Sequence, residues 1–164
     1  MRLVPVLAVA ALLGGCHGGL RDGVFAKEGV RYEIGQPYGQ WRQVGLAGND
    51  LAFVANDSGH SIAVNSTCRD FGDPPLEVLI NHLLIGFTDR VQVSQTPGVL
   101  DGRSCLTAHY TAKLDGVPVE LLLVVMKKDT CVYDFTYVSP SGRFDEKRAA
   151  FDQLLSHFKT EAPK

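Results

Sequence analysis

Four polar side chains, His109, Thr111, Glu120 and Tyr137, are of types that could bind or activate a small molecule together. Glu120 stands in an otherwise apolar segment, and a buried carboxylate is costly unless it is paired. With an imidazole and two hydroxyls beside it, that carboxylate could anchor a ligand in a pocket between sheet and helix, or act as a general base. The simpler interpretation, which we favour, places the four at the exposed margin of a sheet, where Glu120 is solvated and pairs locally with His109.

Two predicted hairpins bring these residues to one sheet face. Asp115-Gly116 lies between two strand-like segments, which is a strong signal for a two-residue turn. Counting outward from this turn sets Thr111 opposite Glu120. A four-residue loop at 127–130 then sets Tyr137 on the other side of Glu120.

The segment 120–126 is predicted to be the central strand of this sheet. Its sequence, Glu-Leu-Leu-Leu-Val-Val-Met, is almost entirely apolar, so both of its faces must be covered. Residues 75–88 and about 143–158 show helical apolar spacing and could supply the cover. The sequence therefore predicts an α+β fold: a predominantly antiparallel sheet of about six to seven strands with one helix on each face.

The two helices have defined apolar stripes and a predicted start. Asp73, or a neighbour, is expected to cap the first helix ahead of Pro74 and Pro75. Other strands are predicted at 30–34, 51–56, 61–68 and around 91–95. The stripes are Leu76, Leu79, Ile80, Leu83, Leu84 and Phe87 in the first helix, and Phe144, Phe151, Leu154, Leu155 and Phe158 in the second.

The order of these elements resembles a known fold. A strand, Pro37 followed four residues later by Trp41, a hairpin, a helix, a long antiparallel meander and a closing helix ending Phe-x-x-Leu-Leu-x-x-Phe are similar to the PsbP-like α/β/α sandwich. The fold is shared by the extrinsic photosystem II subunit, a Ran-binding import factor and several bacterial lipoproteins. The resemblance covers roughly residues 29–160 and implies a three-layer sandwich that acts as a binding or assembly-support module. It carries over no partner-contacting residue.

The N-terminal segment resembles a bacterial lipoprotein signal. After Met1-Arg2 comes an apolar run, 3–13, that is too short to span a bilayer, and Leu13-Gly14-Gly15-Cys16 matches a lipobox. The resemblance implies removal of residues 1–15, a lipid on Cys16 and stable membrane anchoring through two or more acyl chains. The alternatives are an ordinary signal peptide in which Cys16 is incidental, or a buried N-terminal helix.

The predicted mature chain suits a single domain. Residues 16–29 are expected to form a lipidated tether, and residues 30–160 one PsbP-like domain. Because His17, and not aspartate, follows the cysteine, the sorting pattern implies the outer membrane, with the domain facing the periplasm. With 16 basic and 18 acidic residues and no basic run longer than two, the chain is a poor partner for nucleic acid. The expected partners are the membrane, through the N-terminal lipid, and another envelope protein.

Three cysteines remain once Cys16 is assigned to lipid attachment. Cys105 and Cys131 flank the same position of the central strand in the predicted hairpins, which puts them about 9.5 Å apart, beyond disulfide reach. Cys68 must then be one partner of any bond. A bond between Cys68 and Cys131 is favoured because the strand around 91–95 is expected on the Cys105 side. A Cys68–Cys105 bond and no bond at all are the alternatives.

Catalytic and metal-binding motifs are not indicated. The five histidines have no HExxH spacing, and the loop residues Asp50, Asp57, Asp70 and Asp73 lack the spacing of calcium loops and are assigned to turns and caps. No Gly-x-Ser-x-Gly or Cys-x-x-Cys motif is present. The chain is therefore predicted to be non-enzymatic, without cofactor or metal, and to act as an interaction or envelope-assembly module. A periplasmic small-molecule or lipid-binding lipoprotein is the alternative, followed by an envelope hydrolase.

Overall fold

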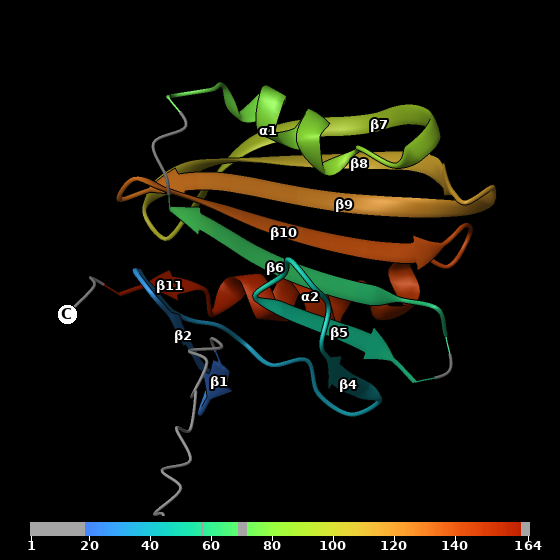
Figure 1. Cartoon of the computed structure of the whole chain (residues 1–164). Helices are drawn as coiled ribbons and strands as arrows, with labels where there is room; N and C mark the ends of the chain where they lie inside the picture. Colours follow the sequence, from blue (N-terminus) through green and yellow to red (C-terminus); the bar gives the residue numbers. More distant parts are fainter. Residues whose placement is uncertain (1–18, 57, 69–71, 162–164) are drawn as a thin grey trace, which may run out of the picture.

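The computed structural model describes residues 19–56, 58–68 and 72–161. Within them the chain forms two antiparallel sheets and two helices (Figure 1). The large sheet has seven strands in the spatial order β4 (Trp41–Val44), β5 (Leu51–Ala55), β6 (Ser61–Cys68), β10 (Cys131–Pro140), β9 (Val117–Lys128), β8 (Arg103–Leu114) and β7 (Phe87–Leu100). The small sheet has four, in the order β1 (Gly19–Arg21), β2 (Val24–Lys27), β3 (Val30–Glu33) and β11 (Lys159–Thr160). The helices are α1 (Leu76–Leu83) and α2 (Asp145–Ser156).

The small sheet corrects the predicted domain boundary. Residues 16–29 were expected to form a tether, but β1 and β2 occupy most of that range, and the Phe25 side chain is only 2% exposed. The turn between these strands is Asp22-Gly23, with φ angles of 50° and 79°. This is the same two-residue turn signal as Asp115-Gly116, hidden in a glycine-rich stretch. Residues from Gly19 onward thus belong to the folded domain, while Cys16 and the rest of residues 1–18 lie outside the described residues.

The first long hairpin has the predicted register. Asp115 and Gly116, with φ angles of 51° and 80°, connect β8 to β9 and leave Leu114 opposite Val117. Thr111 lies opposite Glu120, as counted from the sequence.

The second long hairpin differs from the predicted register by two residues. The loop between β9 and β10 contains only Asp129 and Thr130, so Tyr133, and not Cys131, lies opposite Met126. Asp129 and Thr130 both have positive φ, at 51° and 63°. A β-branched residue rarely adopts this conformation, and the sequence therefore carried no signal for a two-residue turn. A shift of two residues keeps every side chain on its predicted face and moves it along the strand.

Replacing Thr130 with glycine is expected to stabilise the protein. Glycine adopts a positive φ without the steric cost that a β-branched side chain meets, and this outweighs the added freedom of the unfolded chain. We expect a gain of about 0.5–1 kcal/mol in the free energy of unfolding, measured by urea denaturation. The matched control is Gly116→Thr, at the second position of the β8–β9 turn, which should lower the free energy of unfolding. If both substitutions shifted it in the same direction, turn strain would not be the cause.

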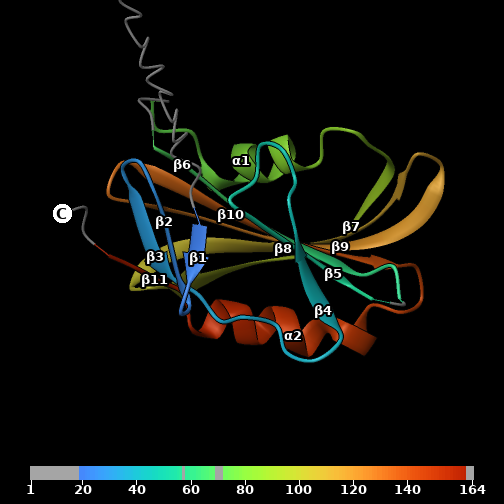
Figure 2. The same cartoon turned by 60° about the horizontal axis from the view of Figure 1, so that its bottom comes forward.

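Two apolar clusters lie on opposite faces of the large sheet, because alternate residues of β8, β9 and β10 point to opposite sides. Ile80 of α1 belongs to the cluster with Leu121, whereas Phe151 and Leu154 of α2 belong to the cluster with Met126 (Figure 2). Both predicted helix stripes are confirmed as core-facing. No helix among the described residues is both long and apolar enough to cross a bilayer.

Both helices are shorter than predicted. The first ends at Leu83 and not at residue 88, because Gly86, with a φ of 93°, breaks the helical path just before β7.

Pro75 occupies the N-cap position with no side-chain cap, so the expected capping by Asp73 is wrong. The Asp73 carboxylate instead forms an ion pair with Lys127.

The edge strand β7 extends far beyond the predicted segment 91–95. It runs for 14 residues, and most of its side chains are exposed on both faces. Irregular register at Thr88/Val91 and Gln92/Ser94 interrupts its pairing with β8. As predicted, β7 lies on the Cys105 side of the sheet and β6 on the far side of β10.

Candidate functional site

His109 and Glu120, two of the four sequence-predicted site residues, are in contact. They lie on adjacent strands, and His109 Nε2 is 3.3 Å from Glu120 Oε2. Their side chains are 19% and 16% exposed. The buried His109 Nε2 has no hydrogen-bond partner among the described residues. Its contact with Glu120 is an ion pair only when the imidazole is protonated, because the neutral ring carries no charge.

The turn that precedes α2 covers this pair. The Gly142 N–H donates a hydrogen bond to Glu120 Oε1 at 2.8 Å. The Phe144 ring stacks on the His109 ring, with centroids 4.2 Å apart, and the Arg148 guanidinium lies 5.6 Å from the Phe144 centroid. Both carboxylate oxygens of Glu120 are thus occupied by contacts within the protein, which position the start of α2.

Thr111 and Tyr137 do not complete a pocket with them. A shallow cavity of about 420 Å³ is lined by His109, Glu120 and residues 142–146 and 148, but by neither Thr111 nor Tyr137. The shorter β9–β10 loop places Tyr137 opposite Leu122, and not beside Glu120 as predicted. The Tyr137 side chain is fully buried, and its hydroxyl donates to the Phe144 carbonyl at 2.8 Å. Thr111 lies on the same face, opposite Glu120.

The geometry favours a structural role for this cluster and the predicted local pairing of Glu120 with His109, but Glu120 is largely buried and not solvated at an exposed sheet margin as expected. Glu120 and Tyr137 both fasten the segment leading into α2, one through Gly142 and the other through Phe144. Burial of Tyr137 raises the pKa of its phenol to about 12, so the hydroxyl remains a hydrogen-bond donor. No serine, threonine, cysteine or lysine side chain is among the residues that line the cavity beside the His109–Glu120 pair.

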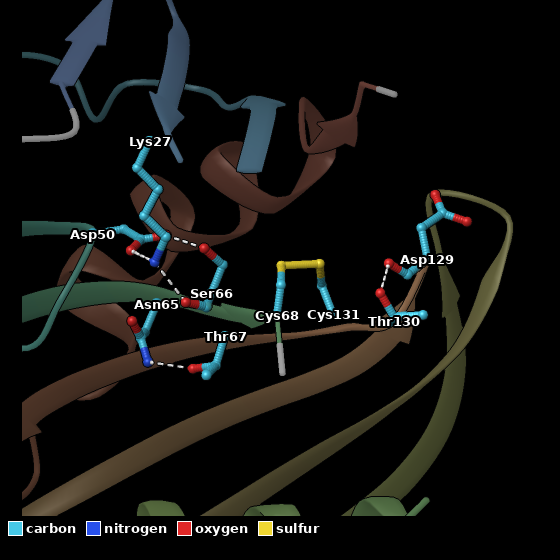
Figure 3. The surroundings of a disulfide bond; sticks show 9 residues. All are labelled: Lys27, Asp50, Asn65, Ser66, Thr67, Cys68, Asp129, Thr130 and Cys131. Carbon is cyan, nitrogen blue, oxygen red and sulfur yellow. Dashed lines mark hydrogen bonds and ion pairs between the residues drawn. A yellow bond between two sulfur atoms is a disulfide. The ribbon is translucent and has the colours of Figure 1, made fainter. Parts of the chain in front are cut away.

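The predicted disulfide between Cys68 and Cys131 is confirmed (Figure 3). The two residues are directly opposite each other where β6 ends and β10 begins, with Cα atoms 4.1 Å apart. Cys105 is free, and its side chain is buried in the core cluster of the α2 face. Burial raises the pKa of the Cys105 thiol, so this cysteine is poorly reactive.

A cavity of about 610 Å³ adjoins the disulfide. Lys127, Lys128, Arg103 and Asp129 contribute to its lining. Lys127 also donates to the Pro74 carbonyl, at 2.8 Å, in addition to its ion pair with Asp73.

Asp101 neutralises Lys128 and joins the two sheets. Its carboxylate lies 2.7 Å from Lys128 Nζ and accepts hydrogen bonds from the Thr160 N–H and hydroxyl at 2.9 and 2.7 Å. Although burial acts in the opposite direction, hydrogen bonds from Lys128 and Thr160 hold the pKa of this carboxyl below its ordinary value. Two of the three cations at this cavity, Lys127 and Lys128, are thus already paired with aspartates, which lowers the charge available to an anionic ligand.

Asp50 forms a largely buried polar cluster, which the sequence analysis missed by assigning Asp50 to a turn. Its side chain is 3% exposed and lies 2.5 Å from Lys27 Nζ (Figure 3). The hydroxyls of Tyr32, at 3.2 Å, and Ser66 also donate to the Asp50 carboxylate. Burial and the neighbouring Asp50 charge raise the pKa of Tyr32 well above its ordinary value. Lys27 and Tyr32 come from the small sheet, so Asp50 fastens that sheet to the large one.

Asp134 is a second carboxyl with an altered environment. It lies on β10 between Asn65 of β6 and Val125 of β9. Burial, reinforced by the negative charge of Asp50, raises the pKa of Asp134 to about 6.

The raised pKa of Asp134 predicts a loss of stability as pH increases. Between the unfolded pKa near 4 and the folded pKa near 6, the folded state binds more protons than the unfolded state. The stabilising effect is therefore complete below about pH 4 and is lost as pH rises through 6. Asp134→Asn should raise the free energy of unfolding by about 3 kcal/mol at pH 7.5 and change it little at pH 4.

Urea denaturation at several pH values tests this expectation. The neighbouring variant Asn65→Ala removes a polar group that does not titrate, and it should keep the wild-type dependence on pH. An equal effect of Asp134→Asn at pH 4 and pH 7.5 would contradict the assignment.

Comparisons with known proteins support the fold. No family model and no curated protein matches the chain. Among solved structures, CyanoP, the cyanobacterial PsbP of Synechocystis, is 16% identical with a TM-score of 0.53, over 94% of this chain and 99% of its own. LpqN of Mycobacterium tuberculosis, a protein involved in cell envelope biogenesis, is 13% identical with a TM-score of 0.55, over 82% and 86%. A Pseudomonas aeruginosa protein of unknown function is 13% identical with a TM-score of 0.53, over 90% and 98%. These likenesses agree with the PsbP-like resemblance at the level of the fold.

Proposed function

We propose that this protein is a lipid-anchored, non-catalytic interaction module of the cell envelope. The anchor is Cys16, and the predicted placement is the outer membrane, with the domain facing the periplasm. Two observations support an extracytoplasmic location: the lipobox-like sequence 13–16 and the Cys68–Cys131 disulfide, a bond that persists in oxidising compartments. The similar fold of LpqN, itself an envelope-biogenesis protein, fits this proposal.

The observation that carries the interaction function is the exposed edge strand β7. Val91, Val93 and Val99 are 60%, 54% and 76% exposed. Among the described residues, β7 pairs with β8 alone, so its other edge has backbone groups available to a further strand. Exposed β-branched residues on an unpaired edge favour β-augmentation, in which an extended segment of a partner adds to the sheet.

The occupant that we propose is a strand of another envelope protein. A second copy of this chain fits less well, because the regular part of β7, residues 94–100, contains Pro97 near its centre. A two-fold β7–β7 pairing would contain two prolines without a backbone N–H, whereas a partner strand without proline would meet only one. A small ligand is the weaker alternative, since several of the charges beside the two cavities are paired internally, as in Lys128–Asp101 and Arg143–Glu146.

Photo-crosslinking in intact cells tests the proposal. A photoreactive amino acid replaces Val99 in the full-length chain and should give an adduct of one discrete mass with another envelope protein. The matched control replaces Tyr38, which is 74% exposed and lies before β4. In a second variant, Val93→Lys with Val91→Lys, charge on the edge should lower the adduct yield at position 99 by about tenfold or more.

Three outcomes would contradict this function. The first is equal adduct formation from Val99 and Tyr38, and the second is a yield unaffected by the lysine pair. The third is an adduct with the mass of two copies of this chain, which would assign β7 to self-association. Circular dichroism of the lysine variant shows whether it retains its fold.

A further inference from the structure

We propose that the end of the small sheet that contains Gly19, Glu28 and Arg31 rests against the phospholipid surface. This inference rests on the proposed lipid attachment at Cys16. It adds which face of the domain meets the membrane and which face is presented to partners.

The length of chain between anchor and domain sets the first limit. β1 begins at Gly19, three residues beyond Cys16. A fully extended chain spans at most about 3.6 Å per residue, so Gly19 stays within about 11 Å of the lipidated residue. The tether predicted from the sequence, residues 16–29, would instead let the domain move several times further from the membrane than three residues do.

Contacts within the domain oppose detachment of β1 from β2, which would lengthen the tether. Gly19, Leu20 and Arg21 pair with Ala26, Phe25 and Val24, and Leu20 packs against the core cluster. The Phe25 ring, itself 2% exposed, stacks on Tyr32 at a centroid distance of 5.0 Å.

The small sheet is also fixed to the large one. Lys27 of β2 reaches the buried Asp50 carboxylate and the Ser66 carbonyl, at 2.5 and 2.6 Å. At the other side, Thr160 of β11 is held by Asp101 of the β7–β8 turn. The limited reach at Gly19 therefore restrains the whole domain, and not only one hairpin.

The strand register identifies the end that faces the lipid. Because neighbouring strands are antiparallel, the start of β1, the end of β2 and the start of β3 lie together, with the exposed turn Glu28-Gly29 between β2 and β3. The C-terminal side of β11 is at this end too, where the Glu161 N–H donates to the Arg31 carbonyl at 3.0 Å.

The charged residues at this end of the small sheet indicate that the tether, and not electrostatic attraction, holds the end at the phospholipid surface. Arg31 forms an ion pair with Glu161, Lys27 is paired with Asp50, and Glu28 adds a negative charge. A surface that binds anionic lipid needs clustered, available lysines and arginines. We therefore expect the contact to persist at high ionic strength and on uncharged phosphatidylcholine.

Fluorescence quenching in vesicles tests the orientation. Full-length lipidated protein carrying Cys105→Ala, to remove the free thiol, receives a single labelling site at Glu28→Cys or at Asp115→Cys. Asp115 is the matched control, because it lies in an exposed turn far from the small sheet. It follows β8, whereas Asp101, which contacts the small sheet, precedes β8, and this 12-residue strand is about 40 Å long. The vesicles contain phosphatidylcholine and a phospholipid with a nitroxide headgroup.

The expected result is several-fold stronger quenching of the label at residue 28 than at residue 115, unchanged by salt. Inserting ten glycine and serine residues between Gly18 and Gly19 should reduce that difference to near unity while leaving the lipid in place. Equal quenching at the two sites with the natural tether, in protein whose lipidation mass spectrometry has verified, would overturn the orientation. Absence of lipid on Cys16 would instead refute the anchoring in the proposed function.

Discussion

Replacing Cys68 and Cys131 together with alanine is expected to lower the free energy of unfolding by roughly 4 kcal/mol. The disulfide links residues 63 positions apart, so its loss restores much conformational freedom to the unfolded chain. The folded structure should persist, because β6 and β10 remain paired along eight residue pairs. Calorimetry should show a melting temperature lower by about 8–16 °C.

Reduction of the wild-type protein provides an independent check. Adding a reductant should reproduce most of the loss in the wild type and have no effect on the double variant. Cys105→Ala is the matched cysteine control, because it removes the free thiol and leaves the disulfide intact. If reductant destabilised the double variant as much as the wild type, the stabilisation could not be assigned to this bond.

Asp50→Ala is expected to lower the free energy of unfolding by about 3 kcal/mol. The substitution leaves the Lys27 ammonium and the hydroxyls of Tyr32 and Ser66 without their shared acceptor, in a site where the Asp50 side chain is only 3% exposed. The small sheet should be affected first. Hydrogen exchange should therefore show loss of protection in β2 and β3 at denaturant concentrations that leave β8 and β9 protected.

A double-mutant cycle separates the ion pair from general disruption. Lys27→Met removes the cation, and the combination with Asp50→Ala should cost less than the sum of the single effects. Asp152→Ala breaks an exposed ion pair with Arg148 on α2 and should cost less than about 1 kcal/mol. Additive effects at positions 27 and 50 would show that the two side chains do not stabilise each other.

The long hairpins show what local sequence can and cannot predict. Asp115-Gly116 defined its turn because both residues readily adopt positive φ, and the register of β8 and β9 followed by counting. Asp129-Thr130 adopts a similar turn without glycine, so its length was misjudged and Tyr137 was misplaced by two residues. The predicted disulfide was still correct, because the register error between β9 and β10 does not change the pairing of the Cys131 strand with β6.

The candidate site depended on contacts distant in sequence, which local patterns do not reveal. Glu120 contacts His109 within one hairpin, and this pair was predictable; its hydrogen bond with Gly142 was not. Asp50 looked like a loop residue because its partners Lys27 and Ser66 lie 23 and 16 positions away. The signal that could have found the small sheet was Asp22-Gly23, flanked by Leu20 and Phe25.

The pairing of β3 with β11 has a consequence for how the chain matures. Glu33 lies opposite Lys159, so the small sheet is completed by a segment that is synthesised much later than β3. At about 5–20 residues per second, roughly 6–25 s separate the synthesis of these two partners. During that interval β3 has an open edge, and Phe25 and Tyr32 lack Phe158, whose ring lies 5.5 Å from the Tyr32 ring in the folded protein. The small sheet is therefore complete only after β11 has been synthesised.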